Sequence, residues 1–220
     1  MLTPFDWQEG IGNRAQYVES RLEQGAPILA LSTDAGLIVF TYRRQSPKIF
    51  EIYDRIVFSA IGQQSDVEAI RIAAVEFAHR EGFSRSEDDV TISRLVSAVS
   101  TPIKQAFSSF NSSPLVARSL FAEIGETIAD DKFYVVDYDG DYRQAEGVAM
   151  VVGTGEPDEE ALRAIDRSLP TEEIVAKLAE IWRSVAGGQD DEDRTAGLTA
   201  EALILDRNTT RENVFRSLAV

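Results

Sequence analysis

Few side chains in this sequence are spaced for metal or nucleotide chemistry. The one histidine, His79, has no second ligand at coordination spacing, and the sequence contains no cysteine. The acidic run 190–193 lacks the ligand spacing and the glycine of a calcium loop, so it is typical of a solvated surface loop. The run 153–155, Gly-Thr-Gly, is too short for a phosphate loop and is not followed by Lys-Ser or Lys-Thr. We therefore expect no metal and no cofactor.

Nucleophilic catalysis needs an attacking group beside a residue that takes its proton. Residues 25–42 read as two short strands joined by a tight turn at 34–36, and Lys48 opens a third strand. Before the first strand, Ala26 offers no hydroxyl to attack a carbonyl, and Pro27 has no backbone N–H to donate. The lysine that follows is a single ammonium group, which gains most from a single carboxylate.

Composition limits the possible classes of function. With 22 basic against 37 acidic residues, the net charge is -15, which argues against direct binding of nucleic acid. The absence of cysteine excludes disulfides and thiolate chemistry. Apolar runs such as 148–152 are too short to span a bilayer, and the amino-terminal residues lack the pattern of a secretory signal. We expect one cytoplasmic domain that binds neither nucleic acid nor membrane.

The sequence alternates clusters of strands with pairs of amphipathic helices. Residues 1–9 are expected to be extended. Helices are predicted over 13–24, 65–82 and 88–110, from 158, from 171 and over 211–218, and strands within 25–42 and over 48–52, 55–62, 115–124, 133–138, 144–153 and 202–206. This order predicts an α+β fold in which two antiparallel sheets pack together with helices outside them.

Five segments resemble proteasome subunits in their order and spacing. They are 48–62 (KIFEIYDRIVFSAIG), 77–83 (FAHREGF), 134–140 (YVVDYDG), 150–157 (MVVGTGEP) and 202–207 (ALILDR). The Lys-Ile…Tyr-Asp-Arg…Gly run of the first segment is especially similar to the α-type subunits of bacterial proteasomes. The resemblance covers residues 13–207.

The resemblance implies a four-layer α-β-β-α sandwich of the Ntn-hydrolase type. It divides the chain into an N-terminal gate segment, a proteasome-subunit domain with an acidic loop inside it, and a C-terminal tail. The corresponding residues are 1–12 for the gate segment, 13–207 for the domain, 187–197 for the acidic loop and 208–220 for the tail.

The resemblance also assigns positions to the parts of a threonine peptidase. Ala26 stands at the nucleophile position, Tyr42 at the acid position and Lys48 at the lysine position. A lysine without the other two groups cannot run the reaction. We therefore expect no catalytic residue, and a chain that is not an enzyme by itself.

Two binding surfaces are implied instead. In the α-type subunits a lysine matching Lys48 lines a pocket for the C-terminal carboxylate of an activator, whereas the alternative is a solvent-exposed lysine at the start of a strand. In the same family, residues before the first helix obstruct the pore, which gives Leu2, Pro4, Phe5 and Trp7 the role of a gate. An ordinary frayed terminus is the alternative there.

The sequence is thus interpreted as a non-catalytic α-type ring subunit of a 20S proteasome that gates substrate access and docks an activator. The implied partners are a catalytic β-type subunit, further copies in a homoheptameric α ring, a hexameric AAA ATPase that binds through its C-terminal tail, and protein substrates in transit. One alternative is a self-compartmentalising Ntn hydrolase matured by cleavage. A weaker one is a stand-alone binding module.

Overall fold

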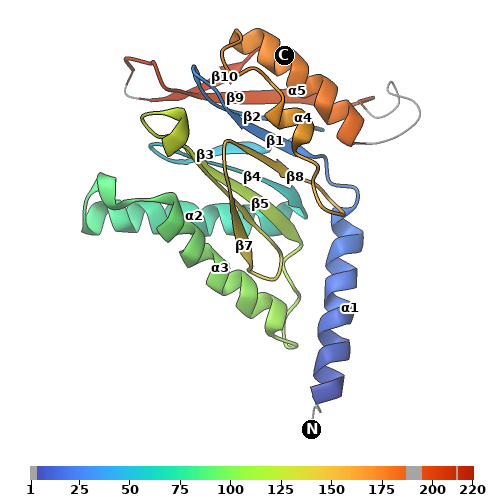
Figure 1. Cartoon of the computed structure of the whole chain (residues 1–220). Helices are drawn as coiled ribbons and strands as arrows, with labels where there is room; N and C mark the ends of the chain where they lie inside the picture. Colours follow the sequence, from blue (N-terminus) through green and yellow to red (C-terminus); the bar gives the residue numbers. More distant parts are fainter. Residues whose placement is uncertain (1–3, 187–194, 212) are drawn as a thin grey trace.

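The structure is a computed structural model that describes residues 4–186, 195–211 and 213–220. Two five-stranded sheets, in which every strand pair is antiparallel, lie face to face with helices on their outer sides (Figure 1). This arrangement confirms the predicted α+β sandwich. No helix of the described residues has both the length and the apolar character needed to cross a membrane.

The first sheet carries the hairpin that the sequence analysis singled out. All residues of β1 and nearly all of β2 are buried, because both faces of this sheet are covered. Gly36, with φ 149°, closes the hairpin, since a Cβ there would lie 2.0 Å from the carbonyl oxygen of Leu205. The strand order is β10 (Phe215–Leu218), β9 (Thr199–Asp206), β2 (Gly36–Arg43), β1 (Ile28–Ser32) and β8 (Val148–Val151).

The second sheet packs against the first, and two long helices cover its outer face. Its strand order is β3 (Ile49–Tyr53), β4 (Ile56–Gly62), β5 (Ala117–Glu123), β6 (Lys132–Val136) and β7 (Tyr142–Ala145). Its outer face is covered by α2 (Gln64–Ser84) and α3 (Ile92–Ser108), whereas α4 (Glu160–Arg163) and α5 (Thr171–Val185) cover the first sheet. Short 3-10 helices are formed by Glu87–Asp89 and Ile128–Asp130.

The core consists of three apolar layers, one between the sheets and one beneath each helix pair. Fully buried phenylalanines occupy these layers: Phe40 beneath α5, Phe58 and Phe121 beneath α2 and α3, and Phe133 between the sheets. One buried ion pair supports the packing, because Arg207, just after β9, contacts Asp131 with Nη2 and Oδ2 2.7 Å apart.

Helix α1 (Pro4–Leu22) projects from the body as a long arm (Figure 1). Its C-terminal half is held by Tyr138, whose hydroxyl donates to Glu19 Oε1 at 2.8 Å and whose pKa is raised by burial and by this hydrogen bond. Its N-terminal half contacts Phe110. The rings of Trp7 and Phe110 pack edge-on, with their centroids 4.8 Å apart. The prediction that residues 1–9 are extended is therefore wrong for residues 4–9, and residues 1–3 lie outside the described part of the chain.

Three other element predictions need correction. The strand predicted over 144–153 is two strands, β7 and β8, which belong to different sheets. The helix predicted over 211–218 is replaced by β10, which pairs with β9. The helix predicted over 88–110 begins at Ile92, after a short 3-10 turn. The predicted division of the chain at 12/13 and 207/208 stays a prediction.

Candidate functional site

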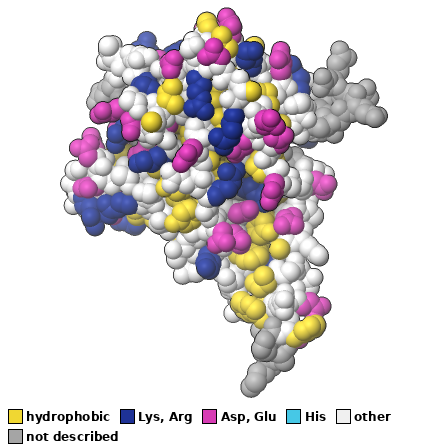
Figure 2. Space-filling view, viewed as in Figure 1, with side chains coloured by type: hydrophobic (Ala, Val, Ile, Leu, Met, Phe, Trp, Pro, Cys, Tyr) yellow, Lys and Arg dark blue, Asp and Glu magenta, His cyan; other side chains and the backbone are white. Residues whose placement is uncertain are grey.

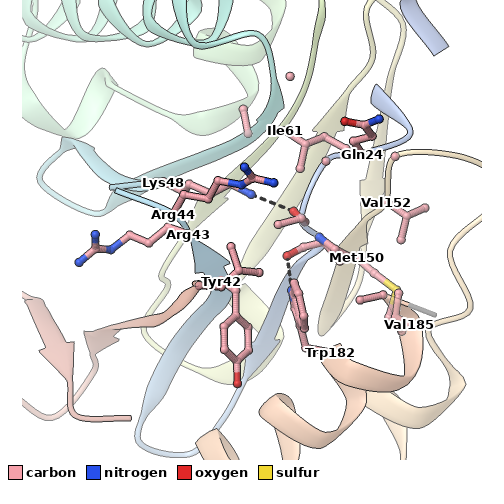
Figure 3. A pocket seen from close by; sticks show the side chains of 18 of the residues that line it. Gln24, Tyr42, Arg43, Arg44, Lys48, Ile61, Met150, Val152, Trp182 and Val185 are labelled. Carbon is pink, nitrogen blue, oxygen red and sulfur yellow. Dashed lines mark hydrogen bonds between the residues drawn. The ribbon is translucent and has the colours of Figure 1, made fainter. Parts of the chain in front are cut away.

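A cleft of about 1260 Å³ opens where the ends of both sheets meet. One wall is the last residue of β2 and the connection to β3, residues 43–48, and another is the segment from the end of α1 to β1 (Figure 3). Apolar side chains of the lining include Val152 and Val185, which are partly exposed, and the buried Ile61, Met150 and Trp182. Acidic side chains also line the cleft, at Glu23, Glu156 and Asp158. The cleft therefore combines apolar and acidic lining residues with a cationic edge that contains Arg44 and Lys48.

Lys48 lies at this edge, at the point where β3 begins. Its ammonium group donates to the carbonyl oxygen of Ala26 at 2.8 Å and lies 3.5 Å from Thr41 Oγ1. No carboxylate of the described residues lies within ion-pair distance of this ammonium group. An ammonium group has three protons to donate, so the third is available to a further acceptor.

Glu201 of β9 fixes the backbone around Lys48. Its carboxylate accepts from the backbone N–H of Lys48 at 2.9 Å and from that of Ile49 at 3.4 Å, and it pairs with Arg43 Nε at 3.6 Å. Burial lowers the pKa of Lys48 from its ordinary value of 10.5 to about 8, while the charge of Glu201 acts in the opposite direction. Lys48 is thus a partly desolvated cation on a fixed backbone.

The position where a nucleophile is implied has backbone carbonyls that are already satisfied. Ala26 has only a methyl side chain, and its carbonyl accepts from Lys48. The next carbonyl, that of Pro27, accepts from Thr41 Oγ1 and from Trp182 Nε1, both at 2.7 Å. Both acceptors are filled by side chains of the chain itself. These hydrogen bonds fix the segment before β1, and residue 26 places only a methyl group beside the ammonium of Lys48.

Tyr42, at the implied acid position, is turned away from this group. Its ring is buried and lies 4.4 Å from the ring of Trp182, on the side away from Lys48 (Figure 3). The structure thus brings Lys48 to Ala26, but residue 42 is a tyrosine whose ring points away from both and supplies no carboxylate. Among the described residues no group of three or more His, Cys, Asp or Glu is placed to hold a metal ion.

The sequence did not predict two residues of the site, Arg44 and Glu201. Arg44 points into the same cleft as Lys48 (Figure 3), and Glu201 fixes the wall from a strand 153 residues further along the chain. The available signal for the first was the pair Arg43-Arg44 close before Lys48. Glu201 gave no local signal, because its role depends on the pairing of β9 with β2.

The predicted gate residues lie far from the cleft, at the other end of α1. Phe5 is 74% exposed, Trp7 is 44% exposed, and hydrophobic side chains gather along the projecting arm (Figure 2). The backbone of Pro4 begins the helix, and Leu2 lies outside the described residues. A helix of this length spans about 28 Å, so the gate residues and Lys48 belong to two separate surfaces.

The fold and the cleft define a member of the Ntn-hydrolase class of sandwiches with no side-chain nucleophile at residue 26. The comparisons with known proteins are more specific. The chain belongs to the proteasome subunit family, because the model of that family, described as Proteasome subunit, matches residues 22–186.

Relatives of the α type share nearly the whole chain. A protein of Jonesia denitrificans named Proteasome subunit alpha is 30% identical over 218 residues, which are 96% of this chain and 90% of the relative. Proteins of the same name from Sanguibacter keddieii and Streptomyces scabiei are both 29% identical; the matches cover 94% and 99% of this chain and 81% and 89% of the relatives. The family expected from the sequence motifs is confirmed.

Proposed function

We propose that this chain is a non-catalytic α-type ring subunit of a 20S proteasome that docks an activator and gates access to the proteolytic chamber. The observation that carries the proposal is the ammonium group of Lys48, which faces the cleft and has no carboxylate partner within the described part of the chain. The names of the relatives support the α type.

Docking uses the cleft. A partner tail that ends in a free carboxylate places one oxygen against the third proton of Lys48, in a charge-assisted hydrogen bond. The partly exposed apolar side chains of the lining, Val152 and Val185, receive the side chains that precede this carboxylate. A hexameric AAA ATPase presents such tails in several copies, which raises the effective concentration of each.

Proteolysis itself belongs to the partners. Ala26 supplies no hydroxyl, so a catalytic β-type subunit performs the hydrolysis while copies of this chain form a homoheptameric ring above it. Protein substrates pass through this ring and undergo no chemical change there. The chain acts in the cytoplasm as a regulator of access.

The gate is the first part of α1. Phe5 and Trp7 lie on the first two turns and expose apolar surface, which gains little from contact with water. Copies of this segment, with Leu2 and Pro4, meet at the ring axis and obstruct the pore.

The proposal is tested on cylinders reconstituted with the β-type partner. Lys48→Ala is expected to reduce activator-stimulated peptide hydrolysis and to leave ring assembly intact, whereas Lys177→Ala, an exposed lysine of α5, is the matched control. Deletion of residues 1–9 is expected to raise hydrolysis without an activator. Stimulation that is equal in the wild type and Lys48→Ala at all activator concentrations would contradict the docking role.

The self-compartmentalising hydrolase is separated by a measurement on the isolated chain. That alternative requires an intact mass below that of the full chain and covalent labelling by a hydroxyl-directed inhibitor. We expect the full-length mass and no label.

A further inference from the structure

The cationic edge of the cleft contains a second unpaired cation beside Lys48. Two arginines follow one another at this edge. Arg43, the last residue of β2, already has partners, because it pairs with Glu201 and donates to the Gln45 carbonyl at 2.7 Å. Arg44 makes no hydrogen bond or ion pair with any residue that the structure describes, and its side chain points into the cleft (Figure 3). The edge therefore has two cations, Arg44 and Lys48, that form no ion pair with a carboxylate of residues 4–186, 195–211 or 213–220.

The connection that carries Arg44 is anchored at its two ends, because Arg43 pairs with Thr199 of β9 on one side and Glu201 binds the backbone of Lys48 and Ile49 on the other. The connection between β2 and β3 is only residues 44–48, and Glu201 accepts from the backbone N–H groups at the end of it. A guanidinium group on a fixed backbone loses less conformational freedom when it binds than one on a mobile loop. Arg44 is thus placed ready for an anion.

The other lining residues show what kind of anion fits. Acidic side chains of the cleft come from the end of α1 and from the connection after β8, at Glu23, Glu156 and Asp158. An anionic group is repelled by them and attracted to the edge with Arg44 and Lys48. The apolar lining between these charges has no use for a free inorganic anion but can cover the side chains of a peptide.

We propose that Arg44 is a second binding residue of the cleft and that it holds, together with Lys48, the C-terminal carboxylate of a partner peptide. The proposal rests on the docking function proposed above and adds the residue that orients the carboxylate. A carboxylate has two oxygens with lone pairs on both sides, so it can accept two parallel N–H bonds from a guanidinium and one from an ammonium group. The ammonium attracts as a point charge, whereas the planar guanidinium fixes the plane of the carboxylate.

The test measures peptide binding to the assembled α–β cylinder. The probe is a library of fluorescein-labelled hexapeptides with free C-termini, screened by fluorescence anisotropy beside the same library with C-terminal amides. We expect that the best free peptide binds the wild type and that its amide does not. Arg44→Ala is expected to weaken the free peptide about fivefold, since Arg44 is exposed, and Arg44→Lys to recover part of the loss. Arg80→Ala, an exposed arginine of α2, is the control.

The outcomes separate this inference from the docking function. If no peptide of the library binds the wild type, both fall. If binding requires the free carboxylate and Lys48 but is unchanged in Arg44→Ala, only the role of Arg44 falls. An equal loss for free and amidated peptides in Arg44→Ala also overturns it, because Arg44 would then contact another part of the peptide. Displacement of the peptide by inorganic phosphate at equal concentration would overturn the choice of a peptide ligand.

Discussion

The affinity of the cleft for a carboxylate is expected to depend on pH through Lys48. Its pKa in the empty cleft is about 8, because burial disfavours the charged form. At pH 7 about nine-tenths of the molecules carry the charged ammonium, and at pH 9 about one-tenth do. If only the charged form binds, the affinity is constant below pH 7 and falls about tenfold between pH 7 and pH 9.

The sign follows from the thermodynamic linkage between proton and ligand. A bound carboxylate favours the charged ammonium, so it raises the pKa of Lys48 above 8 and makes the complex take up protons at alkaline pH. Raising the pH therefore opposes binding. The arginines of the same edge keep their charge over this range and contribute no pH dependence.

The assay is fluorescence anisotropy with a free hexapeptide at constant ionic strength, from pH 6.5 to pH 9.5. For this assay fluorescein is replaced by a rhodamine dye, which does not titrate between pH 6.5 and pH 9.5, on the N-terminus of a peptide that contains no His, Cys, Tyr or Lys. Lys48→Arg keeps a permanent charge and is expected to show a flat profile, and Lys48→Met a weak and equally flat one. A wild-type profile that stays flat to pH 9.5, or one that falls equally in Lys48→Arg, would refute the reasoning.

Three further changes test the fold and the arm. Arg207→Ala is expected to lower the free energy of unfolding by about 3 kcal/mol, because its acidic partner is left buried without a counter-charge, whereas Arg216→Ala, in an exposed pair, should cost less than about 1 kcal/mol in the same denaturant titration. Phe110→Ala should increase amide hydrogen exchange in the first two turns of α1, where an aromatic pair worth about 1 kcal/mol is lost, and Phe83→Ala, 96% exposed, should not. Lys48→Met should be more stable than the wild type by about 2 kcal/mol at pH 7, because the wild type must keep a charged ammonium group partly buried. The wild type gains stability as the pH rises from the pKa of Lys48 in the folded state, about 8, to its value of 10.5 in the unfolded state, and the variant does not. Thermal scans should therefore show the advantage of the variant disappear toward pH 10.

Much of the fold could be predicted because its signals are local. The runs that form β1, β2 and β4 are almost continuously apolar, as strands covered on both faces must be. The helical period of α5 is visible because its polar face meets water. Both kinds of element, strands buried on both faces and helices with one wet face, carry their signal in the local pattern of apolar residues.

The errors fall where a distant contact decides the local structure. Residues 4–9 contain a proline and two aromatic residues, yet they are helical, because Trp7 packs against Phe110, which follows the C-terminal end of α3. A Cβ at Gly10 would lie 2.7 Å from the ring of Phe110, so a glycine allows this close approach. The strand β10 likewise exists only because β9 offers it an edge.

The site shows the same division. Lys48 was recognisable from its motif. Its lowered pKa was not, because the desolvation that causes it comes from residues distant in the sequence that surround the side chain. Glu201 could not be found, since only the pairing of β9 with β2 brings it to the β2–β3 connection. Residue types identified Lys48, and only the tertiary structure shows which groups surround its ammonium group.

The hydrogen bonds around residue 26 explain how a place implied for catalysis can serve binding. In the structure the ammonium of Lys48 and the hydroxyl of Thr41 both donate to backbone carbonyls, at Ala26 and Pro27, and so fix the segment before β1. Both groups donate hydrogen bonds to backbone carbonyl oxygens, and neither is hydrogen-bonded to a side-chain nucleophile at residue 26. The ammonium also donates to Thr41 Oγ1 at 3.5 Å, so one of its three protons remains available, and its partial desolvation strengthens a hydrogen bond to an anion. An anion that enters the cleft therefore meets a donor whose position is already fixed.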